Sequence, residues 1–307
     1  MSIPQHVVKG HGTGNDFVIY ADPEGIYEPT ADEVRFLCDR HFGVGGDGLL
    51  RLAHPEDVAD LDAERAERLR AAGAEWMMDY RNADGSLAEM CGNGTRATAL
   101  FAQTLGYMEG PGGAPLRLGT RAGVKILTSL GEVPGLGGNV FHIDMGPWKA
   151  GESQAYGVTI PDHEGSARGT FVDMGNPHVV AVLEDRTGRS LADDATLPAV
   201  ADLDLSRKPV VDPVIPTDQN VEFVRVDAID EHAGTGEAFM RVNERGCGET
   251  LSCGTGLCAT AVTLRQLTGI GEWTITVRGG TLRVRVTDDN VELTGDACIV
   301  GEVTLRR

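Results

Sequence analysis

The sequence predicts an α+β protein made of two similar halves, and a repeated cysteine segment leads to that prediction. The segment around Cys253, SerCysGlyThrGlyLeuCysAla, has an earlier counterpart around Cys91, MetCysGlyAsnGlyThrArgAla. Each has a cysteine, then Gly-x-Gly, then an apolar run with helical spacing. A Gly-Asn pair precedes each cysteine at nearly the same distance, since Asn15 lies 76 residues before Cys91 and Asn176 lies 77 residues before Cys253.

A third pair of residues at matching positions supports a duplicated domain. Asn82 and Glu244 each lie nine residues before their cysteine. The 307 residues are enough for two domains of about 150 residues with a core in each. We expect one domain at 1–143, completed by a final strand at 296–307, and a second domain at 144–295. If the two halves face each other, their thiols flank a single cleft.

The first half alternates strands and helices. Thr30 is a plausible N-cap ahead of Glu33, which predicts a helix over 30–40 with Cys38 in the core. The acidic and arginine-rich segment 55–73 reads as a solvated helix or mobile insertion without chemistry. Another helix follows Cys91. The expected strands are 7–10, 17–20, 49–52, 76–80, 119–130 and 139–145.

The second half has a similar pattern of short apolar strands. A polar stretch up to about residue 212 is expected to be part helix from Pro198, and a helix follows Cys253. The expected strands are 171–174, 179–183, 218–226, 238–243, 273–277, 282–286, 291–293 and 297–305.

Composition excludes several classes of protein. Hydrophobic residues make up 41% and charged residues 24%, which is typical of a soluble globular protein. No apolar run approaches a membrane span and MetSerIlePro lacks a basic and apolar leader, so we expect a cytoplasmic protein without a membrane partner. A net charge of −19 argues against a nucleic-acid partner. Six cysteines are too few for a disulfide scaffold in a chain of this length.

A cysteine just before Gly-x-Gly at a helix start has a chemical use. The free backbone N–H groups and the positive end of the helix dipole stabilise a thiolate, and glycines let a ligand carboxylate approach them. Two opposed sites of this kind suit racemisation or epimerisation at an amino-acid α-carbon. The alternative to a catalytic role is that both cysteines are buried structural thiols. Zinc is disfavoured because Cys247, Cys253 and Cys258 fit no metal-ligand spacing, so no metal site is expected.

Other polar residues near these segments are candidates for substrate binding. Asn15, Asn82, Asn176 and Asn220 lie in turns, where asparagine also commonly serves the backbone. An adjacent acid and base, Glu244-Arg245, would suit a substrate with its own ammonium and carboxylate, although a surface ion pair is the simpler interpretation. Supporting roles are expected from His178, after Asn-Pro, and from its repeat counterpart Asp16.

Seven motifs in this order resemble the diaminopimelate epimerase family over nearly the whole chain. They are HisGlyThrGlyAsnAspPhe, ArgHisPheGlyValGlyGlyAspGly, AsnAlaAspGlySer, MetCysGlyAsnGlyThrArg, MetGlyAsnProHis, GluArgGlyCysGlyGluThr and SerCysGlyThrGly. The resemblance implies a cofactor-independent isomerase that interconverts LL- and meso-diaminopimelate in lysine and peptidoglycan precursor biosynthesis. It also implies that each half is a curled sheet or barrel around a central helix.

The same resemblance implies roles for individual residues. Cys91 and Cys253 are the acid and base. The residues implied to bind substrate are Asn15, Asn82, Gly92, Asn93, Asn176, Asn220, Glu244, Arg245, Gly254 and Thr255. Two departures from the family pattern stand out: Gly48 replaces a glutamine that contacts substrate in some members, and Cys247 replaces a small residue.

Three other functions are alternatives to this one. A pyridoxal-phosphate racemase would need a Schiff-base lysine beside a phosphate cradle, and no lysine has such a neighbour. A proline or hydroxyproline epimerase would keep both thiols, but its substrate has no distal ammonium and carboxylate. A protein that only binds an amino acid would not need the thiols at all. We leave a homodimer open as the assembly.

Overall fold

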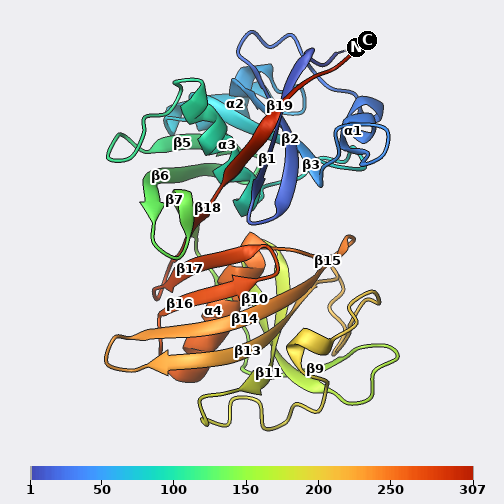
Figure 1. Ribbon diagram of the computed structural model, residues 1–307, viewed down its shortest axis with the longest axis vertical. Coiled ribbons are helices and arrows are strands. Elements are labelled where there is room, and N and C mark those ends of the chain that lie inside the picture. Colours follow the sequence, from blue (N-terminus) through green and yellow to red (C-terminus); the bar gives the residue numbers. More distant parts are fainter. Residues whose placement is uncertain (1, 307) are drawn as a thin grey trace. The chain divides into compact units, whose positions relative to one another are not determined.

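The computed structural model describes residues 2–306. The chain divides into two compact units, one formed by residues 1–143 and 295–307 and the other by residues 144–294. Each unit has a mixed sheet whose strands pass around one central helix (Figure 1). The predicted α+β class with two similar halves is confirmed.

Both units use the same succession of strand pairings. In the first unit the order is β19-β1-β2-β3-β4-β5-β6-β7, and the pairs β2–β3 and β4–β5 are parallel while the others are antiparallel. The strands are β1 (His6–Gly12), β2 (Asn15–Asp22), β3 (Gly48–Ala53), β4 (Trp76–Asn82), β5 (Leu116–Thr120), β6 (Gly123–Val133), β7 (Gly137–Gly146) and β19 (Cys298–Thr304).

The second unit repeats this succession as β10-β11-β13-β14-β16-β17-β18, with β11–β13 and β14–β16 parallel. Short strands β8, β9, β12 and β15, which the sequence pattern did not predict, flank it. The strands are β8 (Lys149–Ala150), β9 (Tyr156–Thr159), β10 (Ala167–Asp173), β11 (Pro177–Asp185), β12 (Val210–Asp212), β13 (Asn220–Asp230), β14 (Thr235–Glu244), β15 (Gly248–Thr250), β16 (Glu272–Val277), β17 (Gly280–Val286) and β18 (Val291–Asp296).

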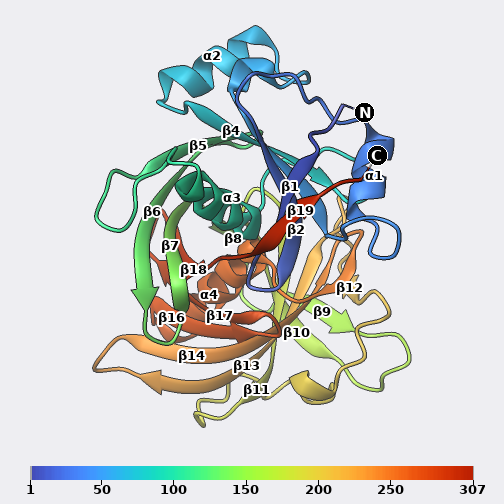
Figure 2. The same ribbon diagram turned by 45° about the horizontal axis from the view of Figure 1, so that its top comes forward.

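The central helices are the crossovers that parallel pairing requires. Helix α3 (Gly92–Thr104) joins β4 to β5, and α4 (Gly254–Thr268) joins β14 to β16. Helix α3 contacts β1, β2, β3, β4, β6 and β19 of its own unit and lies inside their curve (Figure 2). Its residues 92–102 are buried all round, as expected for a helix at the centre of a core.

The other helices lie at the edges of the units. Helix α1 (Ala31–Cys38) begins with the predicted capping box of Thr30 and Glu33, and the predicted core position of Cys38 is confirmed. Burial raises the pKa of Cys38 to about 12. Helix α2 (Ala63–Ala71) occupies the arginine-rich segment and η1 (Pro55–Asp57) precedes it. No helix in the described part of the chain has the length and apolar character that a membrane crossing requires.

Two predicted elements were wrong. The single strand expected at 119–130 is instead a hairpin of β5 and β6, because the chain turns before Gly123, whose φ of +97° favours glycine. The helix expected from Pro198 is only one 3₁₀ turn, η2 (Val200–Asp202), since Leu203 returns to an extended conformation.

A buried ion cluster joins the strands of the first unit. Asp79 on β4 has no exposed surface, and its carboxylate accepts hydrogen bonds from Arg121 at 2.6 Å and from Arg81 at 3.1 Å. Arg51 on β3, also without exposed surface, pairs with Asp22 at 2.7 Å. Buried charges of this kind are tolerated only when they are paired and hydrogen-bonded.

Candidate active site

The Gly-Asn pairs are at tight hairpin turns in both units. Thr13 and Gly14, with φ of +52° and +82°, connect β1 to β2 just before Asn15. Gly175, with φ of +90°, lies between β10 and β11 just before Asn176. Positive φ is the conformation that such turns require and that glycine adopts without strain. Each asparagine is thereby placed on a rigid turn beside the start of a strand.

In the first unit Asn15 meets the cysteine at the start of α3. Cys91 occupies the N-cap position, and its Sγ accepts a hydrogen bond from the Gly94 N–H at 3.4 Å. The same sulfur lies 3.4 Å from Asn15 Oδ1 and donates to it. Asn93 Nδ2 also donates to Asn15 Oδ1, at 3.3 Å. The thiol is therefore held at the positive end of the helix by the neighbouring turn.

A group of charged side chains next to this turn holds Asn15 in place. Asn15 Nδ2 donates to Asp47 Oδ2 at 2.7 Å, and Arg40 bridges Asp47 and Asp16 at 2.8 Å and 2.7 Å. Burial alone would raise the pKa of Asp16, but Arg40 and Lys9 hold the pKa of that carboxyl well below its usual range. Asp16 therefore supports the turn through its ion pairs with Lys9 and Arg40.

Asn82 is on a different turn. Its Nδ2 donates to Ser86 Oγ at 3.0 Å, and across the sheet Asn82 pairs with Gly48. A Cβ at Gly48 would lie 2.6 Å from the carbonyl oxygen of Arg81 and 2.6 Å from Tyr80 Cε2. The space that a glutamine side chain would need at this position is therefore filled by Tyr80 and the β4 backbone.

In the second unit Cys253 is at the N-cap of α4 and is only 6% exposed. Burial raises the pKa of its thiol well above the usual range, and the carboxylates of Glu244 and Glu222 raise it further. Glu244, at the end of β14, accepts a hydrogen bond from Thr250 Oγ1 at 2.5 Å and also contacts the thiol. Burial likewise raises the pKa of Glu244. Cys253 is thus a neutral thiol, the form that can donate a proton.

This protonation state predicts slow alkylation. In the intact protein at pH 7, we expect iodoacetamide to modify Cys253 far more slowly than the exposed Cys247, because only a thiolate attacks the reagent. The rate at Cys253 should rise only in strongly alkaline solution. Peptide mass spectrometry over a pH series measures both rates, and Cys38, whose pKa is raised to about 12, is the matched buried control. Rapid modification of Cys253 at pH 7 would contradict the assignment.

His178 and Asn176 form a chain of polar contacts beside this thiol. His178 has no exposed surface, and its Nδ1 lies within hydrogen-bond distance of Glu222 Oε1, at 2.7 Å. Its Nε2 lies 3.1 Å from Asn176 Oδ1. Asn176 Nδ2 donates to Thr255 Oγ1 at 3.3 Å, and that hydroxyl lies 3.6 Å from Cys253 Sγ.

Asn220 connects this series of polar contacts to the Glu244-Arg245 turn. Its Nδ2 donates to the Pro177 carbonyl at 3.2 Å and its Oδ1 accepts the Arg245 N–H at 2.9 Å. The Arg245 guanidinium is exposed and donates to the Thr217 carbonyl at 3.0 Å. The predicted residues of this unit therefore gather around the start of α4, and the arginine head group lies at their outer edge.

Sequence reasoning missed two carboxylates that hold predicted residues. Glu222 is fully buried on β13, and Asp47 precedes β3. An acid two residues after Asn220, between the apolar Val221 and Phe223, faces the same side as Asn220, so Glu222 could have been found from strand alternation. Asp47 is inside the quoted GlyGlyAspGly motif, but nothing in its spacing connects it to Asn15.

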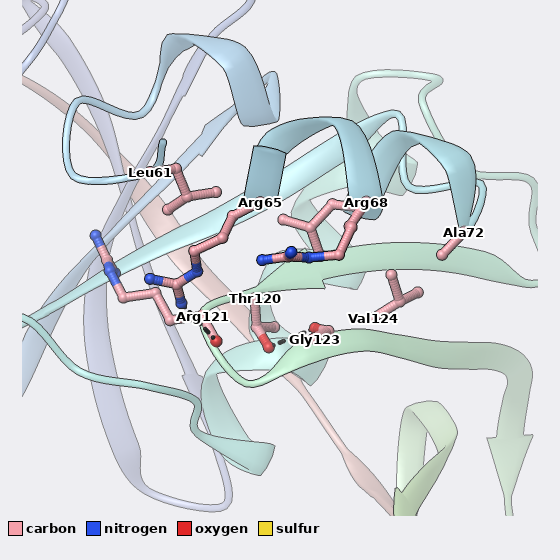
Figure 3. A pocket seen from close by; sticks show the side chains of 9 residues that line it. Leu61, Arg65, Arg68, Ala72, Thr120, Arg121, Gly123 and Val124 are labelled. Atoms are coloured by element: carbon pink, nitrogen blue, oxygen red, sulfur yellow. Dashed lines mark hydrogen bonds between the residues drawn. The ribbon is translucent and has the colours of Figure 1, made fainter. Parts of the chain in front are cut away.

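A cavity of about 370 Å³ in the first unit (Figure 3) has none of the predicted site residues in its lining. Arg65, Arg68 and Arg121 line it together with apolar side chains from α2 and β6. Its cations are already engaged, since Arg121 pairs with Asp60 and Asp79 and Arg68 pairs with Glu64. Within residues 2–306, no group of three or more histidine, cysteine or acidic side chains could hold a metal ion.

Solved structures define the class of fold. The chain is similar to a phenazine biosynthesis protein of the PhzF family from Bacillus anthracis, with 14% identity and a TM-score of 0.63 over 98% of this chain and 99% of that one. It is also similar to a hydroxyproline epimerase from Agrobacterium vitis, with 13% identity and a TM-score of 0.58 over 97% and 91%. The chain therefore shares the fold of these proteins.

Sequence comparison identifies the family. The family model described as diaminopimelate epimerase matches residues 7–132 and 170–300. Diaminopimelate epimerase of Streptomyces coelicolor is 41% identical, over 96% of this chain and 93% of that protein. The Corynebacterium glutamicum protein of the same name is 37% identical, over 99% and 100%. The chain belongs to the diaminopimelate epimerase family, and it is an isomerase.

Proposed function

We propose that this chain interconverts LL- and meso-diaminopimelate without a cofactor, with Cys91 and Cys253 as its two acid/base groups. The observation that carries the proposal is the paired geometry: each cysteine is at the N-cap of the central helix of its unit, and the strand order around both helices is the same. Two equivalent thiols suit a reaction in which one removes the α-proton and the other delivers a proton on the opposite face.

The helix N-termini supply the electrostatic part of the reaction. The α-hydrogen of an amino acid is weakly acidic, so the developing carbanion must be stabilised through the carboxylate. The backbone N–H groups of Gly92, Asn93, Gly254 and Thr255 are proposed to bind that carboxylate. The neutral state of Cys253 makes this thiol the proton donor at rest. Cys91, in the thiolate form that the helix N-terminus stabilises, would take the α-proton of the substrate epimer that presents its α-hydrogen to that side, while Cys253 gives up its own proton to the opposite face.

The remaining polar residues are proposed to select the substrate. Asn82, Asn176, Asn220 and the Glu244-Arg245 pair would bind the distal ammonium and carboxylate, and Asn15 would orient both Cys91 and the ligand. Arg245 is suited to a carboxylate because its guanidinium is exposed and presents several donors. The cytoplasmic location, the homodimer and the closing of the domains over substrate stay predictions.

Solvent exchange tests this function directly. The purified, reduced protein is incubated with LL-diaminopimelate in heavy water without any added cofactor, and the α-carbon is followed by NMR and mass spectrometry. We expect the meso isomer to appear with deuterium at the inverted carbon. Proline and trans-4-hydroxyproline are the comparison substrates. Turnover of these but not of diaminopimelate, or binding of diaminopimelate without exchange, would contradict the proposal.

A further inference from the structure

The proposed acid–base reaction does not use the buried carboxylate of Glu222. The side chain has no exposed surface, and its Oε1 is 2.7 Å from His178 Nδ1. Among the described residues its other oxygen, Oε2, has no hydrogen-bond partner. A buried carboxylate is costly unless a charge-assisted hydrogen bond stabilises it. The contact with His178 is therefore the hydrogen bond that stabilises Glu222 in its orientation.

The strand pairing makes this contact specific. His178 on β11 lies directly opposite Asn220 on β13, and side chains two residues apart on a strand share a face. Glu222 is thus placed under the imidazole on the same face as Asn220. Both ring nitrogens then have polar partners, Glu222 at Nδ1 and Asn176 at Nε2.

Glu222 also packs against the first turn of α4. A Cβ at Gly256 would lie 2.7 Å from Glu222 Oε1 and 3.2 Å from Cys253 Cβ. A larger residue at this point would displace the carboxylate, so glycine allows the helix start and the carboxylate to approach closely. Glu222 is therefore fixed from two sides, by the imidazole and by the turn that carries the thiol.

We propose that Glu222 is a positioning residue that keeps a proton on His178 Nδ1 and so fixes the orientation of the imidazole and of the Asn176 amide. The ordered path runs from Glu222 through His178, Asn176 and Thr255 to Cys253. A carboxylate that orients a histidine by accepting from one ring nitrogen determines which nitrogen faces the reacting groups. The inference depends on the proposed function of Cys253, since His178, Asn176 and Thr255 are the polar residues next to this thiol.

Two substitutions separate orientation from charge. Glu222→Gln keeps an oxygen that accepts from Nδ1, whereas Glu222→Leu keeps the approximate size and removes the acceptor. We expect kcat to fall about 10- to 100-fold in Glu222→Leu, by analogy with the loss of a carboxylate that orients a metal-ligating histidine, and to stay within about threefold of the parent in Glu222→Gln. Glu249→Gln is the matched control, because Glu249 pairs with Arg241 and Arg278 in the same unit and lies outside the path.

A spectroscopic measurement tests the positioning role of Glu222 independently of enzymatic activity. In protein labelled with ¹⁵N-histidine, His178 should show a protonated Nδ1 that exchanges slowly with solvent, and a His178→Gln spectrum assigns the signal. The signal should persist in Glu222→Gln and be lost in Glu222→Leu. The proton on His178 Nδ1 is measured in the parent protein itself. The proposal can therefore be tested even if Glu222→Leu does not fold.

The outcomes are distinct. A His178 that carries its only proton on Nε2 in the parent protein would overturn the proposal, and so would a folded Glu222→Leu with parental kcat. A failure of the proposed function would look different, since the parent enzyme would then show no deuterium exchange into diaminopimelate whatever the state of His178.

Discussion

Cys253→Ala and Cys91→Ala are each expected to lose epimerisation of diaminopimelate, with kcat/KM reduced by about 10³-fold or more. General acid–base groups typically contribute 10²- to 10⁴-fold each. Inversion needs a proton removed from one face and another delivered to the opposite face, so the remaining thiol cannot complete the reaction alone. Initial rates with LL- and with meso-diaminopimelate, under reducing conditions, measure the effect in both directions.

Cys258→Ala is the matched control for this experiment. Cys258 is a fully buried thiol on α4, the same helix that Cys253 caps. Its replacement removes a sulfur from the core without touching the helix start, so we expect kcat to be nearly unchanged and stability to fall modestly. If either N-cap variant is folded and keeps more than about a tenth of the parental kcat/KM, the two-base mechanism fails.

Asp79→Ala is expected to lower the free energy of unfolding by about 3–5 kcal/mol, the largest stability effect that we predict. The substitution removes the buried carboxylate that Arg81 and Arg121 share. Each of these buried guanidinium groups is then left with one partly exposed carboxylate, Glu28 for Arg81 and Asp60 for Arg121. Urea unfolding measures the change. Hydrogen exchange should locate it in residues 1–143, since Asp79 belongs to that unit.

Glu64→Ala provides the contrasting surface pair. Glu64 and Arg68 are 2.5 Å apart on α2, but both side chains are mostly exposed. An exposed pair at this spacing contributes roughly 0.3–0.5 kcal/mol, so its loss should be barely measurable. Equal destabilisation by Glu64→Ala and Asp79→Ala would show that burial of the ion cluster does not determine its contribution.

The parts of the site that the sequence predicted are those set by local structure. A cysteine before Gly-x-Gly and an apolar run specifies a helix start, and a Gly-Asn pair between two apolar runs specifies a tight turn. Thr30 with Glu33 specifies a capped helix in the same way. Where the local signal was weak, the prediction was wrong: the hairpin turn before Gly123 was read as one continuous strand.

The sequence by itself determined the doubled architecture, the positions of Cys91 and Cys253 at the starts of their helices, and the family. Only the tertiary structure decided which side chains support those positions. The contact of Glu222 with His178, the bond from Asn15 to Asp47 and the shared carboxylate of Asp79 all join residues on different strands or loops. Such contacts depend on which strands pair and in which register, and long crossovers allow many registers. Local propensity cannot choose among them, whereas burial of the whole core does.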